Sequence, residues 1–160
     1  MTLSAPTLLT ESHDLELFQS GTDSLDQWLH RRARANQVSG ASRTYVVALE
    51  GRVVGYYCLS SGGLDLADAP GFIRRKMPDP IPVAVLSRLA VDQRWQGKGL
   101  GAALLQDAAL RAAQAAAILG VRGLLVHAIS EEAKGFYEHY GFAASPNNPM
   151  TLVLSLKAST

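Results

Sequence analysis

The sequence predicts a mixed α/β fold, because short segments rich in Val and Tyr, typical of strands, alternate with segments of helical periodicity. The order is strands first, then helix, strand, helix and strand. The chain has 160 residues, of which 48% are hydrophobic, and it contains no repeat or linker. Since this is the usual size of one domain with a substantial core, we expect a single domain over residues 1–160.

The first part of the chain predicts a short strand and a helix. The strand is expected around residues 6–10. Ser24 and Gln27 have the form of a capping box ahead of apolar residues at helical spacing, which predicts a helix over residues 24–38. Gly40 is expected to end this helix.

A β-hairpin and a long connection are expected next. Residues 43–49 and 53–60 are rich in Val and Tyr, and the turn-forming residues 50–52 separate them. Residues 61–82 contain two adjacent glycines and four prolines, so we expect a long loop with one short helical turn at residues 72–77.

The second half predicts two strand–helix units and a closing strand. Residues 83–91 have the pattern of a buried strand, and an Ala- and Leu-rich helix is expected over residues 100–119. A strand over residues 123–128 precedes Ser130, which we expect to cap a helix that ends at Gly141. The expected last strand spans residues 151–156.

The charge balance excludes a globally basic nucleic-acid-binding protein, because 15 basic residues oppose 14 acidic ones. The single cysteine, Cys58, cannot form an internal disulfide, which fits a reducing compartment. The chain begins without a basic and then apolar leader, and no apolar stretch has membrane-spanning length. We therefore expect a cytoplasmic protein without membrane contact.

A glycine-rich segment, Gln96-Gly97-Lys98-Gly99-Leu100-Gly101, joins the predicted strand to the predicted long helix. Glycines at a helix N-terminus let backbone N–H groups face a phosphate or pyrophosphate; a flexible turn without a ligand is the alternative. A magnesium-dependent phosphate loop is excluded because Lys98 is followed by Gly99 instead of Ser or Thr. A dinucleotide-binding domain is disfavoured because no acidic residue closes the next strand.

These residues resemble the GNAT acetyltransferases, whose signature Q/R-x-x-G-x-G/A is matched from Gln96 to Gly101. Ala133, Tyr137 and Gly141-Phe142 match a second family motif at the expected spacing. The likeness extends from about residue 15 to residue 156 and is closest to the GNAT toxins of toxin–antitoxin pairs, of the TacT and AtaT type. It rests further on Leu25-Asp26-x-Trp28-Leu29, Arg74-Arg75-x-Met77-Pro78-x-Pro80-Ile81-Pro82, Leu89-Ala90-Val91 and His127-Ala128 before Glu131-Glu132-Ala133-Lys134.

The resemblance implies the GNAT fold, a mixed and mostly antiparallel sheet with helices on both faces. It also implies acetyl-CoA as acyl donor and no metal. Backbone groups of the strand before the loop would lie along the cofactor, and the loop would hold its pyrophosphate. The implied cofactor-binding residues are Leu89, Ala90, Val91, Gln96, Gly97, Lys98, Gly99, Leu100 and Gly101.

Tyr137 occupies the position where many GNAT enzymes keep a tyrosine that protonates the leaving sulfur. A phenol is protonated at neutral pH and can act as an acid. Packing on an amphipathic helix is the alternative role, and Tyr140 is the nearby rival. The family's frequent strand glutamate is missing, since residues 83–91 contain no acid; Glu131 and Glu132 could act through water, although helix-dipole complementarity also explains both.

The resemblance implies a toxin that acetylates the α-amine of aminoacyl-tRNA and so blocks translation. Implied partners are aminoacyl-tRNA, a small ribbon-helix-helix antitoxin and a second copy of the chain. Two alternatives stay open: an ordinary GNAT enzyme acting on a small amine or protein N-terminus, and a non-catalytic CoA-binding or partner-binding domain. The identities of the aminoacyl-tRNA and of any general base, the oligomeric state and a neighbouring antitoxin gene are not determined by the sequence.

Basic residues occur in local groups that could contact RNA phosphates. A solvated surface or contacts with an antitoxin would explain any one of them equally well. The candidates are Arg31, Arg32, Arg74, Arg75, Lys76, Arg88 and Arg94.

Overall fold

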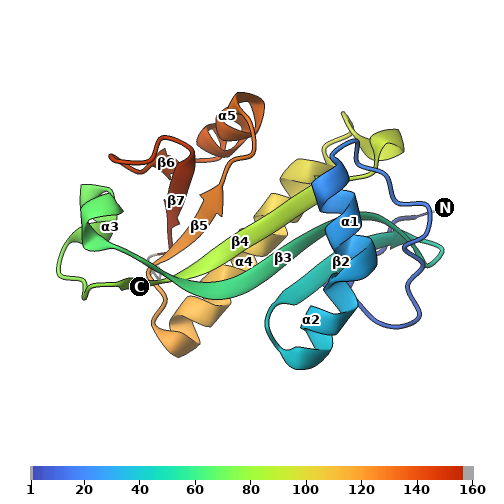
Figure 1. Cartoon of the computed structure of the whole chain (residues 1–160), viewed down its shortest axis with the longest axis horizontal. Helices are drawn as coiled ribbons and strands as arrows, with labels where there is room; N and C mark the ends of the chain where they lie inside the picture. Colours follow the sequence, from blue (N-terminus) through green and yellow to red (C-terminus); the bar gives the residue numbers. More distant parts are fainter. Residues whose placement is uncertain (1, 157–160) are drawn as a thin grey trace. The chain divides into compact units, whose positions relative to one another are not determined.

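The computed structural model describes residues 2–156, whose helices and strands are labelled in Figure 1. These residues form two compact units. The first unit contains the residues up to Ser60 together with Ser87–Ala108, and the second contains Ser61–Leu86 together with the residues from Ala109 onward. The ends of the predicted domain, residue 1 and residues 157–160, lie outside the described residues.

Seven strands and five α-helices occur in the described part of the chain, with two short 3-10 helices between them. The strands are β1 (Thr7–Leu8), β2 (Arg43–Leu49), β3 (Arg52–Leu64), β4 (Ile81–Val91), β5 (Gly123–His127), β6 (Ala143–Ala144) and β7 (Thr151–Ser155). The helices are α1 (Asp23–Arg31), α2 (Ala33–Ser39), η1 (Leu66–Asp68), α3 (Gly71–Arg74), η2 (Gln93–Trp95), α4 (Leu100–Leu119) and α5 (Glu131–His139). The polypeptide passes from one unit to the other within β3, β4 and α4.

The strands are hydrogen-bonded in the order β1-β2-β3-β4-β5-β7-β6. In the first unit β2 pairs antiparallel with both β1 and β3. In the second unit β4 and β5 are parallel, with Val83 opposite Gly123, whereas β7 runs antiparallel to β5 and β6. The predicted mixed and mostly antiparallel sheet is confirmed.

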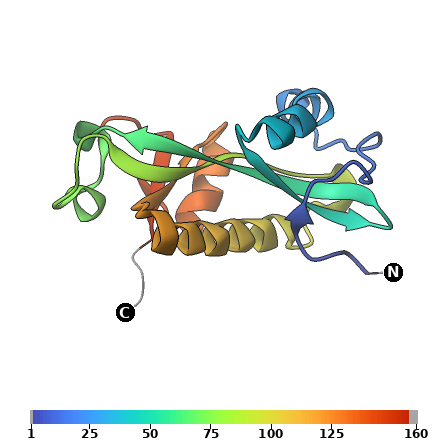
Figure 2. The same ribbon diagram turned by 90° about the horizontal axis from the view of Figure 1, so that it is seen from below.

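The first unit has helices on both faces of its strands, as Figure 2 shows. On one face, Leu29 of α1 and Ala33 of α2 pack with Tyr56 of β3 in a buried core. On the other face, an added Cβ at Gly55 would lie only 3.0 Å from the Leu104 side chain of α4. The missing side chain at Gly55 therefore lets the long helix pack closely on β3.

The second unit has its own apolar core. Ile73 of α3, Ile81 and Val83 of β4, Leu125 of β5 and Val153 of β7 are buried together. Because α3 has only four residues, it depends on tertiary contacts for its stability. No helix among residues 2–156 has the length and apolar character needed to cross a membrane.

The helix predicted from about residue 24 to residue 38 is wrong in its capping residue and in its continuity. Thr22 precedes the first helical residue, without a side-chain capping hydrogen bond, so Ser24 does not cap the helix. The helix also breaks at Arg32, whose φ of −122° departs from helical geometry. The apolar periodicity continues through this break and so did not reveal it. After the break, the Arg34 guanidinium donates hydrogen bonds to the distant carbonyls of Thr10 and His13.

The predicted long loop over residues 61–82 is also wrong, because β3 extends to Leu64 and β4 begins at Ile81. Gly62 stands where an added Cβ would lie 2.8 Å from Val85, and one at Gly63 would lie 3.0 Å from Pro80. These glycines permit close packing within the sheet instead of forming a turn.

Most other predicted elements are confirmed. The hairpin turn consists of Glu50 and Gly51, both at positive φ, as a two-residue turn of this type requires. Helix α4 has the predicted limits, and Ser130 caps α5 by accepting a hydrogen bond from the Ala133 N–H at 3.0 Å. The strand β6 was not predicted; its two residues are too few for a pattern.

Candidate active site

The glycine-rich loop forms an open backbone cradle in the first unit. Gly97 and Gly99 have φ values of +75° and +84°, which side chains with a Cβ rarely adopt. No atom lies within 4 Å of the place where a Cβ would stand at either glycine. Leu100 and Gly101 begin α4, so the cradle lies at the N-terminus of a long helix, where backbone N–H groups and the helix dipole favour an anion.

Gln96 fastens the loop to the rest of the first unit. Its Nε2 donates hydrogen bonds to the carbonyl oxygens of Ser20 at 2.7 Å and of Val91 at 2.9 Å. The glutamine side chain is thus occupied within the protein, and only its backbone is left to face a ligand. The preceding segment is held too, since the Gln93 N–H donates to the Gln19 carbonyl at 2.8 Å.

Asp92 is a second anchor, and the sequence motifs do not include it. It is 1% exposed, and its carboxylate accepts hydrogen bonds from the N–H groups of Gln19 and Arg94 and from the Arg94 guanidinium. Burial alone would raise the pKa of Asp92, but these hydrogen bonds and the Arg94 charge hold the pKa below its ordinary value. An acid directly after an apolar strand was the signal available in the sequence.

The predicted cofactor strand, Leu89 to Val91, lies at the end of β4. Ala90 is buried in the core of the first unit, while Leu89 and Val91 are half-buried. Successive side chains of a strand alternate between its faces, so Leu89 and Val91 share the face opposite Ala90.

Arg88 caps an aromatic stack on the face of β4 that bears Ala90. Its guanidinium carbon lies 4.4 Å from the centroid of the Trp28 ring, a cation–π arrangement. Trp28 in turn stacks on Tyr56 at 6.1 Å, and the Tyr56 hydroxyl donates to the Leu25 carbonyl at 2.6 Å. The half-buried Arg88 guanidinium is therefore held in place by the Trp28 ring. The sequence motif that contains Trp28 gave no indication of this contact.

Tyr137 lies in the second unit, on α5. It is buried between Phe136 and Phe142, at ring distances of 5.3 and 5.4 Å. Burial raises its pKa to about 12, and within residues 2–156 its hydroxyl has no hydrogen-bond partner. The phenol therefore stays protonated well above neutral pH and keeps a proton to donate.

Tyr140, the rival to Tyr137, has different surroundings. It is 45% exposed, and its ring contacts Phe136 and His139 edge-on. Burial thus distinguishes the two tyrosines, because Tyr137 is enclosed and Tyr140 is largely open to solvent.

The basic candidates are divided between the two units. The first unit contains Arg31 and Arg32, exposed at the α1–α2 junction, together with Arg88, Arg94 and Lys98. The second contains the exposed residues Arg74, Arg75 and Lys76 at the end of α3, where Lys76 has a φ of +59°. Within the described residues, no cluster of three or more His, Cys, Asp or Glu side chains could hold a metal ion.

An open glycine cradle at a helix N-terminus is typical of proteins that bind a phosphate-bearing ligand. The family model described as "Acetyltransferase (GNAT) domain" matches residues 40–144, which include β2 to β5, the cradle, α4 and α5. The chain belongs to the GNAT acetyltransferase family.

Known relatives agree with this assignment. A protein of Mycobacterium tuberculosis (strain ATCC 25618 / H37Rv) named tRNA-acetylating toxin is 52% identical over 96% of this chain and 93% of its own length. The solved structure "AtaT complexed with acetyl-methionyl-tRNAfMet" is similar with a TM-score of 0.90 at 30% identity, covering 98% of this chain and 96% of that one. AtaT bound to the C-terminus of the antitoxin AtaR and acetyl-CoA has a TM-score of 0.83 at 28% identity, with coverages of 98% and 95%.

Proposed function

We propose that this protein is an acetyl-CoA-dependent N-acetyltransferase toxin that acetylates the α-amine of aminoacyl-tRNA and so blocks translation. The observation that carries the proposal is the 52% identity, along nearly the whole chain, to a protein named tRNA-acetylating toxin. The likeness to AtaT complexed with an acetylated aminoacyl-tRNA supports the same substrate class.

The glycine cradle fits the pyrophosphate of acetyl-CoA. Gly97 and Gly99 leave open space beside a helix N-terminus, and Lys98 adds a positive charge within the loop. We assign pyrophosphate binding to residues 96–101 and contact with the pantetheine arm to the backbone of residues 89–91. Acetyl-CoA supplies the acetyl group as a thioester.

We assign Tyr137 the role of general acid. When the amine nitrogen bonds to the thioester carbonyl carbon and the carbon–sulfur bond breaks, the phenol would donate its proton to the departing thiolate. The raised pKa of Tyr137 supports this assignment, because an acid must be protonated before it acts. The proton lost by the amine would pass to water, and the phenolate would be protonated again from solvent.

No carboxylate is assigned as general base. Residues 83–91 contain no acid, and both Glu131 and Glu132 are exposed in the first turn of α5, where they complement the helix dipole. A substrate amine that is already largely neutral, or that loses its proton to water, needs no protein base.

RNA contacts are assigned to exposed cations in both units. Arg31 and Arg32 lie at a helix junction, and Arg74, Arg75 and Lys76 lie beside a short helix. Such side chains bind phosphates without reading the base sequence. This suits an RNA substrate that is recognised by its aminoacylated end and its phosphate backbone. Arg88 and Arg94 differ, because aromatic stacking and Asp92, respectively, restrain them.

We further propose that the two units act as one acetyltransferase domain over residues 1–160, since the family match extends through both. The AtaT structure with an antitoxin segment supports an antitoxin partner for this chain. From the family resemblance we also propose that this partner is a small ribbon-helix-helix protein. On the same ground we propose that the chain forms a homodimer and acts in the cytoplasm.

Incubation with acetyl-CoA and a complete set of charged tRNAs tests the function. The expected product is N-acetyl-aminoacyl-tRNA from one or a few tRNAs, detected after nuclease digestion by mass spectrometry. Uncharged tRNA is the control, because it offers no α-amine.

Three outcomes would contradict the proposal. No acetylated product from any charged tRNA would exclude the substrate class. Turnover with small amines or protein N-termini only would indicate an ordinary GNAT enzyme. Binding of CoA without any turnover would indicate a non-catalytic domain.

A further inference from the structure

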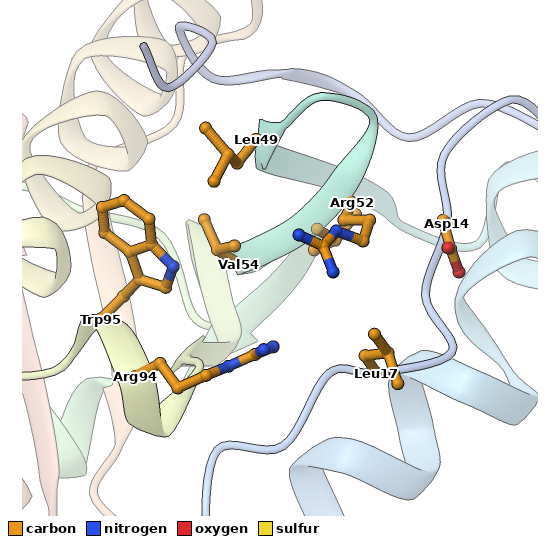
Figure 3. A pocket seen from close by; sticks show the side chains of 8 residues that line it. Asp14, Leu17, Leu49, Arg52, Val54, Arg94 and Trp95 are labelled. Carbon is orange, nitrogen blue, oxygen red and sulfur yellow. The ribbon is translucent and has the colours of Figure 1, made fainter. Parts of the chain in front are cut away.

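A small hollow in the first unit lies beside the glycine-rich loop and is separate from the cradle. Figure 3 shows the side chains that line it. Its walls come from the loop before α1, the β2–β3 hairpin and η2, and it has a cavity volume of about 110 Å³. The lining residues are Asp14, Leu17, Leu49, Arg52, Val53, Val54, Arg94 and Trp95.

Three donors converge on this hollow. The guanidinium groups of Arg52 and Arg94 both point into it, and the ring nitrogen of Trp95 is on the side of the indole that faces it (Figure 3). Guanidinium and indole N–H groups can donate hydrogen bonds but cannot accept them. The complement to such a set is therefore an acceptor with negative charge.

Arg52 lacks a partner of its own within residues 2–156. Its backbone is next to that of Asp14, since the Val53 N–H donates to the Asp14 carbonyl at 2.9 Å, yet the guanidinium points away from the Asp14 carboxylate. That carboxylate accepts instead from the Glu16 N–H at 2.9 Å. Two guanidinium groups that face one hollow repel each other unless an anion lies between them.

Arg94 is held in position by a different anchor. Its Nε and Nη2 donate to the Asp92 carboxylate at 3.0 and 3.4 Å, which leaves Nη1 available. Leu17, Leu49 and Val54 supply apolar walls that reduce competition from water around the charges. The site is thus partly preorganised, although Asp14 at its edge lowers the net positive charge.

The hollow has room for several water molecules, which suffices for a tetrahedral phosphoryl group. We propose that Arg52, Arg94 and Trp95 bind a phosphoryl group at this place. The phosphoryl group could belong to the nucleotide part of acetyl-CoA or to an RNA backbone. Both of these sources rest on the proposed function, whereas binding of a phosphoryl group does not.

Inorganic phosphate is the direct probe, because it tests the site without catalysis. The ¹⁵N-labelled full-length chain has two indole N–H signals, from Trp28 and Trp95. Titration with phosphate at constant ionic strength is expected to move the Trp95 signal to saturation and to leave the Trp28 signal in place. Arg52→Gln is expected to abolish the saturable shift, and Asp14→Asn is expected to tighten binding by removing a nearby negative charge.

Lys98→Gln is the control for binding at the cradle, because the Lys98 ammonium lies 5.2 Å from the centroid of the Trp95 ring and could transmit a shift. This variant should keep the response. Loss of the shift in Lys98→Gln, or its persistence in Arg52→Gln, overturns the proposal.

Two further measurements distinguish the sources. If the phosphate belongs to acetyl-CoA, Arg52→Gln weakens CoA binding about tenfold but leaves 3′-dephospho-CoA binding unchanged. If it belongs to RNA, Arg52→Gln lowers the salt slope of tRNA binding by about one. If Arg52→Gln changes the binding of neither CoA nor tRNA, the proposed role of the site is wrong. Failure of tRNA acetylation alone would contradict the proposed function but would not affect the result of the phosphate titration.

Discussion

Tyr137 and its rival Tyr140 show how burial distinguishes two residues of the same type. Tyr137 lies on α5 and Tyr140 directly follows that helix, and a phenol at either position could supply a proton. Tyr137 is enclosed by Phe136 and Phe142, and burial raises its pKa, while Tyr140 is 45% exposed. The catalytic role stays a prediction, but the environment of Tyr137 suits an acid that must stay protonated.

Replacing Tyr137 by Phe should lower kcat by about 100-fold or more, because it removes the proton donor and keeps the ring. Binding of CoA should be unchanged, and expression should no longer arrest growth. Steady-state kinetics and calorimetry would measure the two effects. Tyr140→Phe is the matched control and should retain activity; equal losses in both variants would remove Tyr137 from this role.

The pH profile of the unaltered protein provides a second check on Tyr137. A raised pKa extends the protonated form to higher pH, so the loss of kcat due to phenol ionisation should occur near pH 12 instead of about 10, the ordinary value. A decline in kcat centred near pH 10 that is absent in Tyr137→Phe would contradict the raised pKa of Tyr137, whereas a decline near pH 10 that persists in Tyr137→Phe would belong to another group.

At the scale of elements, the strand β3 depends on glycines that lack side chains. Gly62 lies against Val85 of β4, and Gly63 lies against Pro80. By local pattern, two adjacent glycines indicate a turn. In the folded chain they continue a strand, because the neighbouring side chains occupy the space where a Cβ would stand.

Gly62→Ala should destabilise the protein by about 1–3 kcal/mol, because its Cβ would approach the branched Val85 side chain to 2.8 Å. Urea unfolding followed by fluorescence would measure the change. Gly71→Ala is the control, since nothing lies within 4 Å of its added Cβ, and it should be close to neutral. A Gly62→Ala protein as stable as its parent would show that β3 and β4 can separate locally at no cost.

The glycine-rich loop is likewise held by a neighbouring element. The segment before α1 contacts the loop through Gln19, Ser20 and Gly21, which meet Asp92, Gln96 and Gln93 respectively. An anion cradle requires backbone N–H groups in fixed directions. These distant contacts supply the fixation that two left-handed glycines could not supply alone.

For the whole molecule, the net charge of +1 provides little long-range attraction for RNA. Binding of RNA must therefore depend on local cations, which lie at the α1–α2 junction in the first unit and at the end of α3 in the second. Such cations release counterions when they bind RNA phosphates, so affinity should fall steeply with salt.

Replacing Arg74 and Arg75 together by Gln should reduce the salt slope of tRNA binding by about two, because each arginine is expected to neutralise one phosphate. Filter binding over a range of salt concentrations would measure it. Arg43→Gln is the matched control, because the Arg43 guanidinium already donates to the carbonyl oxygens of Gln37 and Ser42. An unchanged slope in the double variant would assign Arg74 and Arg75 to solvent or to a protein partner.

The sequence by itself determined the elements whose signals are local: the hairpin at Glu50-Gly51, the limits of α4, the Ser130 cap and the glycine-rich loop. Family motifs added the predictions that residues 96–101 hold acetyl-CoA and that Tyr137 is the general acid. These features were predictable because turn chemistry, capping and helical periodicity act over a few residues.

Tertiary structure decided the rest. It extended β3 through Gly62, broke the first helix at Arg32 and buried Tyr137 while leaving Tyr140 exposed. It also brought Asp92 to Gln19, Trp28 to Arg88 and Arg52 to the lining of the hollow. Each of these outcomes depends on which distant residue fills the neighbouring space or supplies the hydrogen-bond partner, and such pairings have no signature in the local sequence.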